Sequence, residues 1–558
     1  MRKVRLFGRE MRTARFQRSF MKLFLLSMME PGRLAVFRCK FFIGGVEEID
    51  RAGQRAPGRR IPNCVEKRTI LEVMSSSTPD QTSISFTEQD LTAFSEASGD
   101  RNPLHLNREY ARGTPYGQPV VFGCLGAIAC LSHIRPPVGW RVASIEAEFL
   151  RPMFLGVNYR VETWAKENRW GARLFDGSMP TASVTVAVDR SLGNETPRIA
   201  DCSVFERRDA AVLQQGGIIP GLTVSGKYAC DPAALAAVGA RWGVTDRLLM
   251  TVFSWSSYLV GMELPGESAL FSKLVLLFQG TARFPATVAY RASVASVDPR
   301  FGQIKLDVSL LDGASPVVSG HCWSYIRPTV PETEEIDSAG VRPGSLAGRT
   351  AVLLGSSRGL GAALKGALEL RGVEVYGMSR SVAAGGASRS EVGDAADPEA
   401  LRRLRERVAS EHGRLDFLIC NACPPILPLR LEPNAAERIG AYINEAVSLT
   451  LAPPAEFLEM LNHSDGCAVI ISSEAVERPV REWPHYVAAK RAVETLGCVA
   501  ALQYPRVRTL IVRPRKLLTT MTNTPMGRLG AALPGPLAKR IAARLEDPLE
   551  PGKTEILS

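Results

Sequence analysis

The chain has 558 residues, too many for one hydrophobic core, so we expect about three domains. Its composition, 45% apolar and 22% charged, is typical of a soluble globular protein, and no run approaches the roughly 18–20 apolar residues of a membrane span. Residues 1–75 hold 17 basic and 7 acidic side chains and so carry +10 of the net charge of +11. Because the excess charge is confined to this segment, we expect neither a nucleic-acid nor a membrane partner for the folded part.

Residues 1–79 are predicted to be a basic, disordered leader. Three interpretations stay open: a targeting peptide, a segment that binds an anionic partner, and a tail without function. The eleven cysteines show no regular framework, which favours a reduced compartment and a cytoplasmic protein. The single CxxC, Cys420–Cys423, has no second pair or His cluster beside it, so we expect no metal site.

Residues 80–205 are predicted to begin with a helix and continue as strands. Thr87 is a suitable N-cap because Asp90 follows three residues later, and Gly99 is a suitable end. Alternating apolar residues predict the strands Ala143–Leu150, Tyr159–Trp164 and Ala182–Val188.

A weak internal repeat follows the Gln/Gly-rich connector Gln214–Gly221 and spans residues 222–328. The strands at Ile145–Phe149 and Val157–Val161 have counterparts at Leu274–Phe278 and Val288–Ala292, each pair separated by a turn that contains Pro. Two copies suggest a pseudo-dimer of one small α+β unit.

A linker, 329–345, leads to residues 346–558, where strands alternate with helices as in a parallel, doubly wound α/β sheet of the Rossmann type. The strand Ala351–Leu354 runs into a glycine-rich turn and then a helix through Leu370, an arrangement that binds the phosphates of a dinucleotide. The residues expected to bind the cofactor in this turn are Gly355, Ser357, Arg358, Gly359, Leu360 and Gly361.

The second strand, Val373–Met378, ends at Ser379-Arg380 instead of at an acidic residue that would hold the ribose 2′-OH of NAD. The guanidinium groups of Arg380 and Arg358 suit the 2′-phosphate of NADP, so we expect NADP in preference to NAD.

Tyr486 and Lys490 are four residues apart and share one helix face. An ammonium group beside a phenol favours the phenolate, so we expect Lys490 to lower the pKa of Tyr486 from about 10 and make it a usable acid/base. Ser473 ends the predicted strand Cys467–Ser472, thirteen residues before Tyr486.

Residues 346–525 resemble the short-chain dehydrogenase/reductase family, especially its 3-oxoacyl reductases. The resemblance implies that Tyr486 is the acid/base, that Lys490 tunes it and contacts the ribose, and that Ser473 holds the substrate oxygen. It also implies that Asn444 binds a structural water and that Asp394 contacts the adenine. Asn421 would belong to the turn after the fourth strand, residues 420–423, which we call the cofactor-side turn. The family's Asn-Asn-Ala-Gly is here Cys420-Asn421-Ala422-Cys423.

The stretch Ser98-Gly99-Asp100-Arg101-Asn102-Pro103-Leu104-His105 follows the first predicted helix. A carboxylate and an imidazole five residues apart in a tight turn can act on one water, as the addition of water to a conjugated double bond requires. Downstream, Gly123 and Cys124 begin an apolar helix, whose free N–H groups could polarise a thioester carbonyl.

Residues 86–131 resemble the MaoC-type hot-dog family of (R)-specific enoyl-thioester hydratases/dehydratases. The resemblance implies that Asp100 and His105 are the acid/base pair and that the backbone of Gly123 and Cys124 is the oxyanion site. The second repeat lacks the motif. We expect it to complete a double hot-dog and form part of an acyl tunnel, with His321 as a packed residue and not a catalyst.

The favoured function is that of a bifunctional enzyme. The C-terminal part would interconvert 3-oxoacyl and 3-hydroxyacyl thioesters with NADP, and the N-terminal part would interconvert 3-hydroxyacyl and trans-2-enoyl thioesters, in fatty acid or polyketide metabolism. The expected partners are acyl-CoA or an acyl carrier protein, and a second copy of the chain in a homo-oligomer. Three alternatives stay open: an N-terminal part that only binds the acyl chain or its carrier, an NAD-dependent β-oxidation enzyme, and a reductase fold that serves only as a scaffold.

Overall fold

The computed structural model describes residues 82–136, 140–190, 209–213, 215–279, 288–327, 340–380, 389–547 and 550–558. The predicted leader, 1–79, lies outside these ranges, as does most of the predicted linker, 329–345. Two sheets with separate hydrophobic cores make up the described chain, one within residues 83–326 and the other within residues 350–557.

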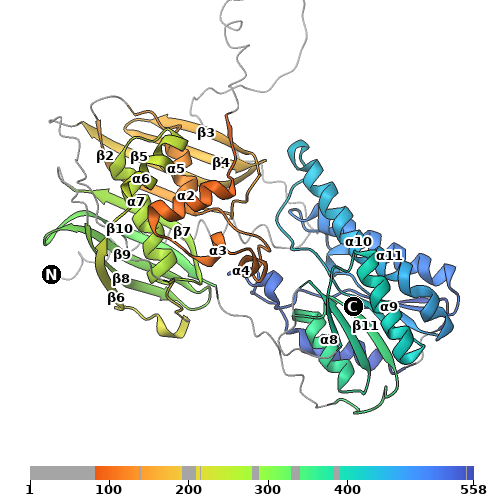
Figure 1. Cartoon of the computed structure of the whole chain (residues 1–558). Helices are drawn as coiled ribbons and strands as arrows, with labels where there is room; N and C mark the ends of the chain where they lie inside the picture. Colours follow the sequence, from red (N-terminus) through yellow and green to blue (C-terminus); the bar gives the residue numbers. More distant parts are fainter. Residues whose placement is uncertain are drawn as a thin grey trace, which may run out of the picture. The chain divides into compact units, whose positions relative to one another are not determined.

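The first sheet has ten strands, and all its neighbouring strands are antiparallel (Figure 1). In sheet order they are β1 (Ser83–Ile84), β3 (Tyr159–Lys166), β4 (Arg169–Asp176), β5 (Met179–Arg190), β2 (Trp140–Phe149), β7 (Ala269–Phe278), β10 (Ser315–Ile326), β9 (Gln303–Asp312), β8 (Val288–Asp298) and β6 (Thr223–Tyr228).

The strand order of this sheet is the same in its two halves when each is read outward from the centre. The series β2-β5-β4-β3-β1 on one side corresponds to β7-β10-β9-β8-β6 on the other. The central strands β2 and β7 pair antiparallel, with Glu148 opposite Lys273. The strands that show the weak sequence repeat, β2 and β3 against β7 and β8, therefore occupy equivalent places in the sheet.

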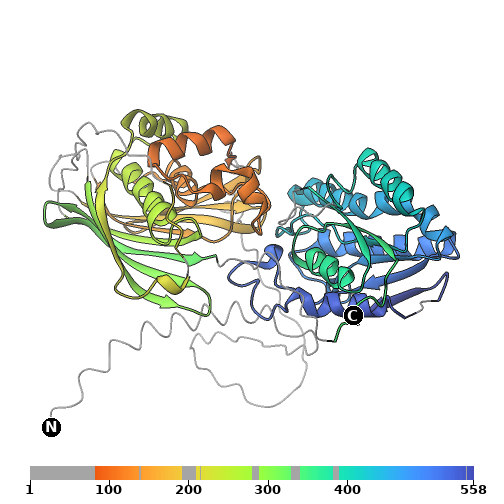
Figure 2. The ribbon, with the colours of Figure 1, turned by 60° about the horizontal axis from the view of Figure 1, so that its bottom comes forward.

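Helices lie on one side of the ten-stranded sheet (Figures 1 and 2). They are α2 (Glu88–Ser98), α3 (Pro103–Leu106), α4 (Arg108–Arg112), α5 (Gly123–Leu131), α6 (Pro232–Trp242) and α7 (Arg247–Tyr258), which continues into the π-helical turn η2 (Leu259–Glu263).

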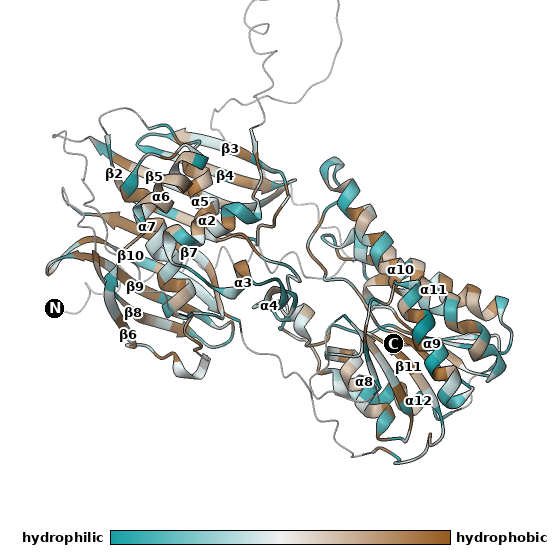
Figure 3. Cartoon of the chain, viewed as in Figure 1, coloured by the Kyte–Doolittle hydropathy of each residue, from teal (hydrophilic) through white to brown (hydrophobic). Residues whose placement is uncertain are grey.

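The boundaries predicted for α2 are confirmed. Thr87 and Asp90 form a reciprocal capping box, and Gly99 ends the helix with a φ of 71°. Helix α5 is apolar on all sides, which explains why every residue from Cys124 to Leu131 is buried between the sheet and α7 (Figure 3).

The second sheet has seven strands, all parallel, as predicted for the C-terminal part. In sheet order they are β13 (Ser390–Val392), β12 (Glu374–Ser379), β11 (Thr350–Leu354), β14 (Phe417–Cys420), β15 (Cys467–Ile471), β16 (Arg508–Val512) and β17 (Thr554–Leu557).

Helices cover both faces of this sheet, so β11 is buried along its whole length. Helices α8 (Gly359–Glu369) and α12 (Pro534–Arg544) pack on one face, and α9 (Pro398–His412), α10 (Ala436–His463) and α11 (Pro484–Gln503) pack on the other. The strand order reverses between β11 and β14, and in such sheets ligands bind at the carboxyl ends of the strands beside this point.

Candidate active sites

Asp100 lies directly after α2 and is buried, with 2% of its surface exposed. Its Oδ2 accepts a hydrogen bond from Ser257 Oγ at 2.7 Å, and its Oδ1 accepts one from the backbone N–H of Asn102 at 3.0 Å. Burial raises the pKa of Asp100 to about 6, although these two hydrogen bonds oppose the shift. Asp100 is therefore a carboxylate that can take up a proton close to neutral pH.

His105 lies on α3, which begins at Pro103 after the N-cap Asn102. Its Nδ1 is 2.6 Å from the carbonyl oxygen of Val120. A carbonyl only accepts, so Nδ1 carries the hydrogen and Nε2 of the neutral ring has a free lone pair. Burial lowers the pKa of His105 to about 4, which keeps this ring neutral at physiological pH.

The first turn of α5 lies beside both of these residues. The ring of Phe122, the residue before the helix, stacks on His105 with centroids 3.9 Å apart, and the Asp100 charge is one cause of the raised pKa of Cys124. No side chain caps this helix end, so the N–H groups of Gly123 and Cys124 remain available as donors. The predicted acid/base pair and the predicted oxyanion donors are thus brought together.

The second half of the ten-stranded sheet domain supplies two residues that the sequence did not suggest. Ser257, on α7, holds the Asp100 carboxylate. Gly261, in η2, lies so close that a Cβ there would be 2.6 Å from both carboxylate oxygens. Neither belongs to a recognisable motif, and 157 residues separate Ser257 from Asp100.

His321, predicted to be a packed residue and not a catalyst, is half-buried on β10. Its Nδ1 lies 2.8 Å from Asp307 Oδ1, and 41% of its side-chain surface is accessible. It alternates along the strand with buried Cys322, so it points to the solvent side of the sheet. Its ring packs against that of Trp323, with centroids 5.6 Å apart, and it lies outside the core.

In the parallel sheet, the glycine-rich turn joins β11 to α8. Gly355 and Gly359 have φ angles of 81° and 56°, which favour glycine. A Cβ on Gly361 would be 1.9 Å from the carbonyl oxygen of Gly355, so only glycine fits there. Asn421 Nδ2 donates a hydrogen bond to that same oxygen at 2.9 Å. The turn is therefore held tight against the end of β14.

The start of α8 fits a dinucleotide phosphate. Its N-cap, Arg358, makes no side-chain cap, so the first N–H groups of the helix, including those of Gly359, Leu360 and Gly361, are free to bind an anion. Ser357 lies in the turn that leads to them and is partly exposed.

Two arginines gather beside this turn. Burial, and then nearby positive charges that include Arg380, lower the pKa of Arg358. Arg380 follows β12, and its Nη1 lies 3.8 Å from Glu445 Oε1. Asp394 lies beyond β13, and its Oδ1 accepts a hydrogen bond from the N–H of Ala396 at 2.9 Å. The contacts of Arg358, Arg380 and Asp394 with the second ribose and the adenine of a dinucleotide stay predictions.

Tyr486 and Lys490 both lie on α11, and Ser473 follows β15. Lys490 Nζ donates a hydrogen bond to the carbonyl oxygen of Ile471 at 2.8 Å and lies 5.8 Å from the centre of the Tyr486 ring. The expectation that Lys490 lowers the pKa of Tyr486 was wrong for this structure. Burial, and next the nearby Cys423, raise the pKa of Tyr486, while a hydrogen bond with Ser473 opposes the shift.

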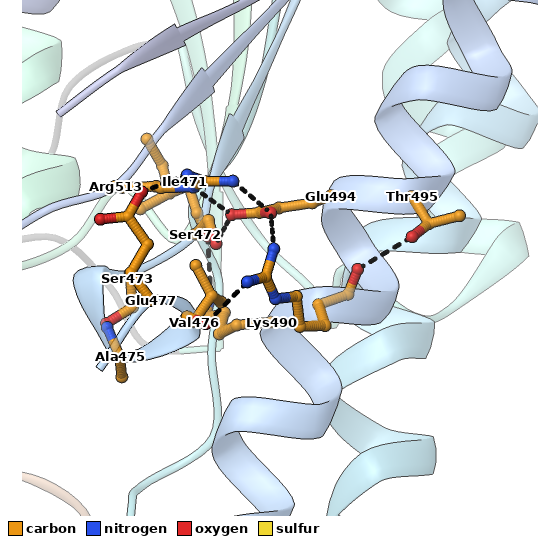
Figure 4. Close-up of polar contacts among 11 residues, drawn as sticks. Ile471, Ser472, Ser473, Ala475, Val476, Glu477, Lys490, Glu494, Thr495 and Arg513 are labelled. Carbon is orange, nitrogen blue, oxygen red and sulfur yellow. Dashed lines mark hydrogen bonds and ion pairs between the residues drawn. The ribbon is translucent and has the colours of Figure 1, made fainter. Parts of the chain in front are cut away.

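A buried ionic network supports this site (Figure 4). Ser472 Oγ donates to Glu494 Oε1 at 2.6 Å, and Arg513 binds both Glu494 oxygens, through Nε at 2.8 Å and Nη2 at 2.9 Å. Glu494 lies one turn beyond Lys490 on α11, so the network ties this helix to the ends of β15 and β16. Sequence reasoning missed this support because its residues carry no motif of their own.

Asn444 is exposed on α10. Two residues earlier, Tyr442 is directed toward the cofactor-side turn instead: its hydroxyl lies 3.8 Å from Cys423 Sγ and 3.3 Å from the carbonyl oxygen of Pro424. The structure therefore brings Tyr486, Lys490 and Ser473 together, and the water-binding role of Asn444 stays a prediction.

The described part of the chain contains no group of three His, Cys, Asp or Glu residues arranged to hold a metal ion. Within the same ranges, no helix has the length and the apolar character needed to cross a membrane.

Comparison with known families gives two matches. Residues 349–528 match the short chain dehydrogenase family, and residues 73–186 match the MaoC like domain. An uncharacterized oxidoreductase of Mycobacterium tuberculosis is 31% identical over 188 residues, which cover 31% of this chain and 70% of that protein.

Solved structures with low overall similarity include an alcohol dehydrogenase from the archaeon Thermococcus sibiricus complexed with 5-hydroxy-NADP. It is 22% identical, and the match covers 38% of this chain and 95% of that one with a TM-score of 0.34. The ligand-free aldohexose dehydrogenase of Thermoplasma acidophilum is 19% identical, covering 38% and 94% with a TM-score of 0.35. With the glycine-rich turn, Tyr486, Lys490 and Ser473 in place, the chain belongs to the short-chain dehydrogenase family, and it carries a MaoC-like domain before its dehydrogenase domain.

Proposed function

We propose that the protein is a bifunctional enzyme that acts on the β-carbon of acyl thioesters. Its dehydrogenase domain interconverts 3-oxoacyl and 3-hydroxyacyl groups, and its MaoC-like domain interconverts (R)-3-hydroxyacyl and trans-2-enoyl groups. The observation that carries the proposal is the position of Asp100 and His105 beside the uncapped first turn of α5, where the ring of Phe122 stacks on His105 at 3.9 Å. An acid/base pair at that place suits a thioester whose double bond is conjugated with its carbonyl.

Hydration adds the OH of water to C3 and a hydrogen to C2. The free Nε2 of His105 takes a proton from the water, and the Asp100 carboxylate orients that water by accepting its other hydrogen. The proton is returned to C2, which restores the neutral imidazole. Negative charge that develops on the thioester oxygen is stabilised by the N–H groups of Gly123 and Cys124. Dehydration follows the same steps in reverse. We propose a double hot-dog fold for this domain, with the second half forming part of the acyl site.

In the dehydrogenase domain, a bound nicotinamide supplies or accepts the hydride at C3. The Ser473 hydroxyl holds the substrate oxygen, and the Tyr486 phenol donates a proton to it during reduction or takes one from it during oxidation. Lys490, fixed on the Ile471 carbonyl, is placed to bind the ribose. The neighbouring guanidinium groups of Arg358 and Arg380 favour the 2′-phosphate of NADP. NADP in turn favours the biosynthetic direction, as in fatty acid or polyketide assembly.

The test uses the purified full chain and acyl groups carried on coenzyme A and on a carrier protein. A trans-2-enoyl thioester alone should lose its conjugated absorbance, and Asp100→Asn should lower that rate by roughly 10²–10⁴-fold. A 3-oxoacyl thioester should oxidise NADPH at the same rate in the wild type and in Asp100→Asn, which shows that the variant is folded. If the enoyl thioester binds but is never hydrated, the MaoC-like domain is a binding module. If NADH replaces NADPH without loss, the biosynthetic assignment is wrong.

A further inference from the structure

The half of the ten-stranded domain that lacks the acid/base motif contacts the proposed hydration site directly. Ser257 lies near the end of α7, with 5% of its surface exposed, and Asp100 is 2% exposed, so their hydrogen bond of 2.7 Å is shielded from water. The other carboxylate oxygen is held by the N–H of Asn102. Each oxygen of Asp100 thus has one donor, and one of the two donors comes from the second half.

The turn after α7 also fits against the carboxylate. Helix α7 widens into the π-helical turn η2, a distortion that is frequent at functional sites. The backbone at Gly261 approaches Asp100 so closely that a Cβ there would be 2.6 Å from both oxygens. Asn102 Nδ2 donates to the Gly261 carbonyl oxygen at 3.0 Å, which fastens the Asp100 loop to this turn.

The charged and titratable groups around Asp100 include no cation that could replace the serine. Cys124 on α5 and Tyr228 at the end of β6 both have a pKa raised by burial first and in part by the Asp100 charge. His105 is neutral, and the positive charge of Arg327 acts on that ring. Within the described ranges, no Lys or Arg makes an ion pair with Asp100. The two hydrogen bonds are therefore its principal stabilising contacts.

We propose that Ser257 is a positioning residue of the hydration site, which keeps Asp100 ionised and correctly oriented, so that both halves of the sheet domain build one composite site. This inference rests on the proposed hydration chemistry. It also explains how a half without an acid/base motif takes part in catalysis beyond binding an acyl chain.

The test compares Ser257→Ala with Ser256→Ala in the full chain. Ser256 is the matched control because it is the neighbouring buried serine, and its hydroxyl donates to the backbone oxygen of Val252 at 2.8 Å. The first readout is the infrared band of protonated carboxyl groups followed against pH, with the Asp100 contribution assigned by its loss in Asp100→Asn. The second readout is the pH profile of enoyl-thioester hydration.

Ser257→Ala should move the Asp100 titration upward from about 6 by roughly one unit or more, because a hydrogen bond to a charged group is lost. The acid limb of the hydration profile should move with it, and Ser256→Ala should match the wild type in both measurements. Ser257→Cys, which replaces the hydroxyl by a weaker donor of similar size, should shift both in the same direction by less. It serves as the second variant if Ser257→Ala does not fold.

An unchanged titration in both Ser257 variants would overturn the proposal. An infrared shift in a protein that hydrates no enoyl thioester would uphold the role of Ser257 toward Asp100 and reject the proposed hydratase function. Because the infrared measurement needs no substrate, the two failures are distinguishable.

Discussion

The amide of Asn421 donates a hydrogen bond to the carbonyl oxygen of Gly355 at 2.9 Å, which ties the end of β14 to the glycine-rich turn after β11. This contact crosses the point where the strand order of the parallel sheet reverses. It explains how the cofactor-side turn can carry cysteines at positions 420 and 423 and still support the glycine-rich turn. The asparagine makes the hydrogen bond, while Cys420 packs in the core and Cys423 Sγ lies 3.8 Å from the Tyr442 hydroxyl.

Gly361→Ala should disrupt this arrangement, because the new Cβ would be 1.9 Å from the Gly355 oxygen and 2.7 Å from the Asn421 amide. We expect a loss of roughly 1–3 kcal/mol in the free energy of unfolding and at least roughly tenfold weaker NADPH binding. Gly440→Ala is the control, since Gly440 is also helical and a Cβ there meets nothing within 4 Å. Fluorescence titration with NADPH measures the effect, and equal affinity in the two variants would contradict it.

Arg380→Ala should weaken NADPH binding by about 10–100-fold and leave NADH binding unchanged, because a charge-assisted contact with the 2′-phosphate is lost. Arg402→Ala is a suitable control, since Arg402 is an exposed arginine on α9 that pairs with Glu399. The ratio of kcat/KM for the two cofactors measures the change. An equal loss of kcat/KM with NADPH and with NADH would show that Arg380 supports the fold and does not bind the 2′-phosphate.

Tyr486→Phe should lower the rate of 3-oxoacyl reduction by roughly 10²–10⁴-fold, because the proton donor is removed while the ring and its packing remain. Tyr504→Phe, at the C-terminal end of the same helix, should have no such effect. Stopped-flow oxidation of NADPH gives the rate, and NADPH affinity shows whether the site is intact. A Tyr486→Phe enzyme with half the wild-type rate would exclude Tyr486 as the acid.

Two buried aspartates should respond oppositely to replacement by asparagine. The folded-state pKa of Asp100 is raised to about 6, so its contribution to stability is present below its ordinary pKa near 4 and is lost as the pH rises through 6. Asp100→Asn should therefore stabilise the protein at pH 8, by up to about 3 kcal/mol, and hardly at pH 4. Asp416 is held by Arg349 Nη1 at 2.6 Å and by Arg414 Nη2 at 2.5 Å. Asp416→Asn should therefore destabilise the protein at pH 8, because it leaves these two cations without their buried partner.

Thermal unfolding of both variants at the two pH values tests this difference in sign. A lower midpoint for Asp100→Asn at pH 8 would show that the ionised carboxylate stabilises the folded chain. In that case, burying the ionised Asp100 would not lower the free energy of unfolding.

Local signals made much of this fold predictable. The capping box at Thr87 and the end at Gly99 define α2, and the glycine-rich turn predicts where β11 meets α8. Strand β4 was not predicted, because Gly171 and the arginines of Arg169–Asp176 obscure its alternation. It is nevertheless paired on both sides, by β3 and β5, and tertiary pairing overrides its weak local preference.

Contacts between distant segments were the part that sequence could not reveal. Ser257 reaches Asp100 only because the two halves of the sheet pack their helices together. The family resemblance pointed to Asn444 on α10, but only the structure shows that the Tyr442 hydroxyl of the same helix lies 3.8 Å from Cys423 Sγ. Spacing also put Lys490 beside Tyr486 but could not show that its ammonium group is bound to the Ile471 carbonyl.

The most direct test of the bifunctional proposal is to incubate the full chain with a 3-oxoacyl thioester and NADPH and to identify the products by mass spectrometry. The wild type should yield both the 3-hydroxyacyl and the trans-2-enoyl thioester, Asp100→Asn should stop at the 3-hydroxyacyl thioester, and Tyr486→Phe should leave the substrate unchanged. If Asp100→Asn still forms the enoyl thioester, or if the wild type never does, the two domains do not share an intermediate in the way proposed.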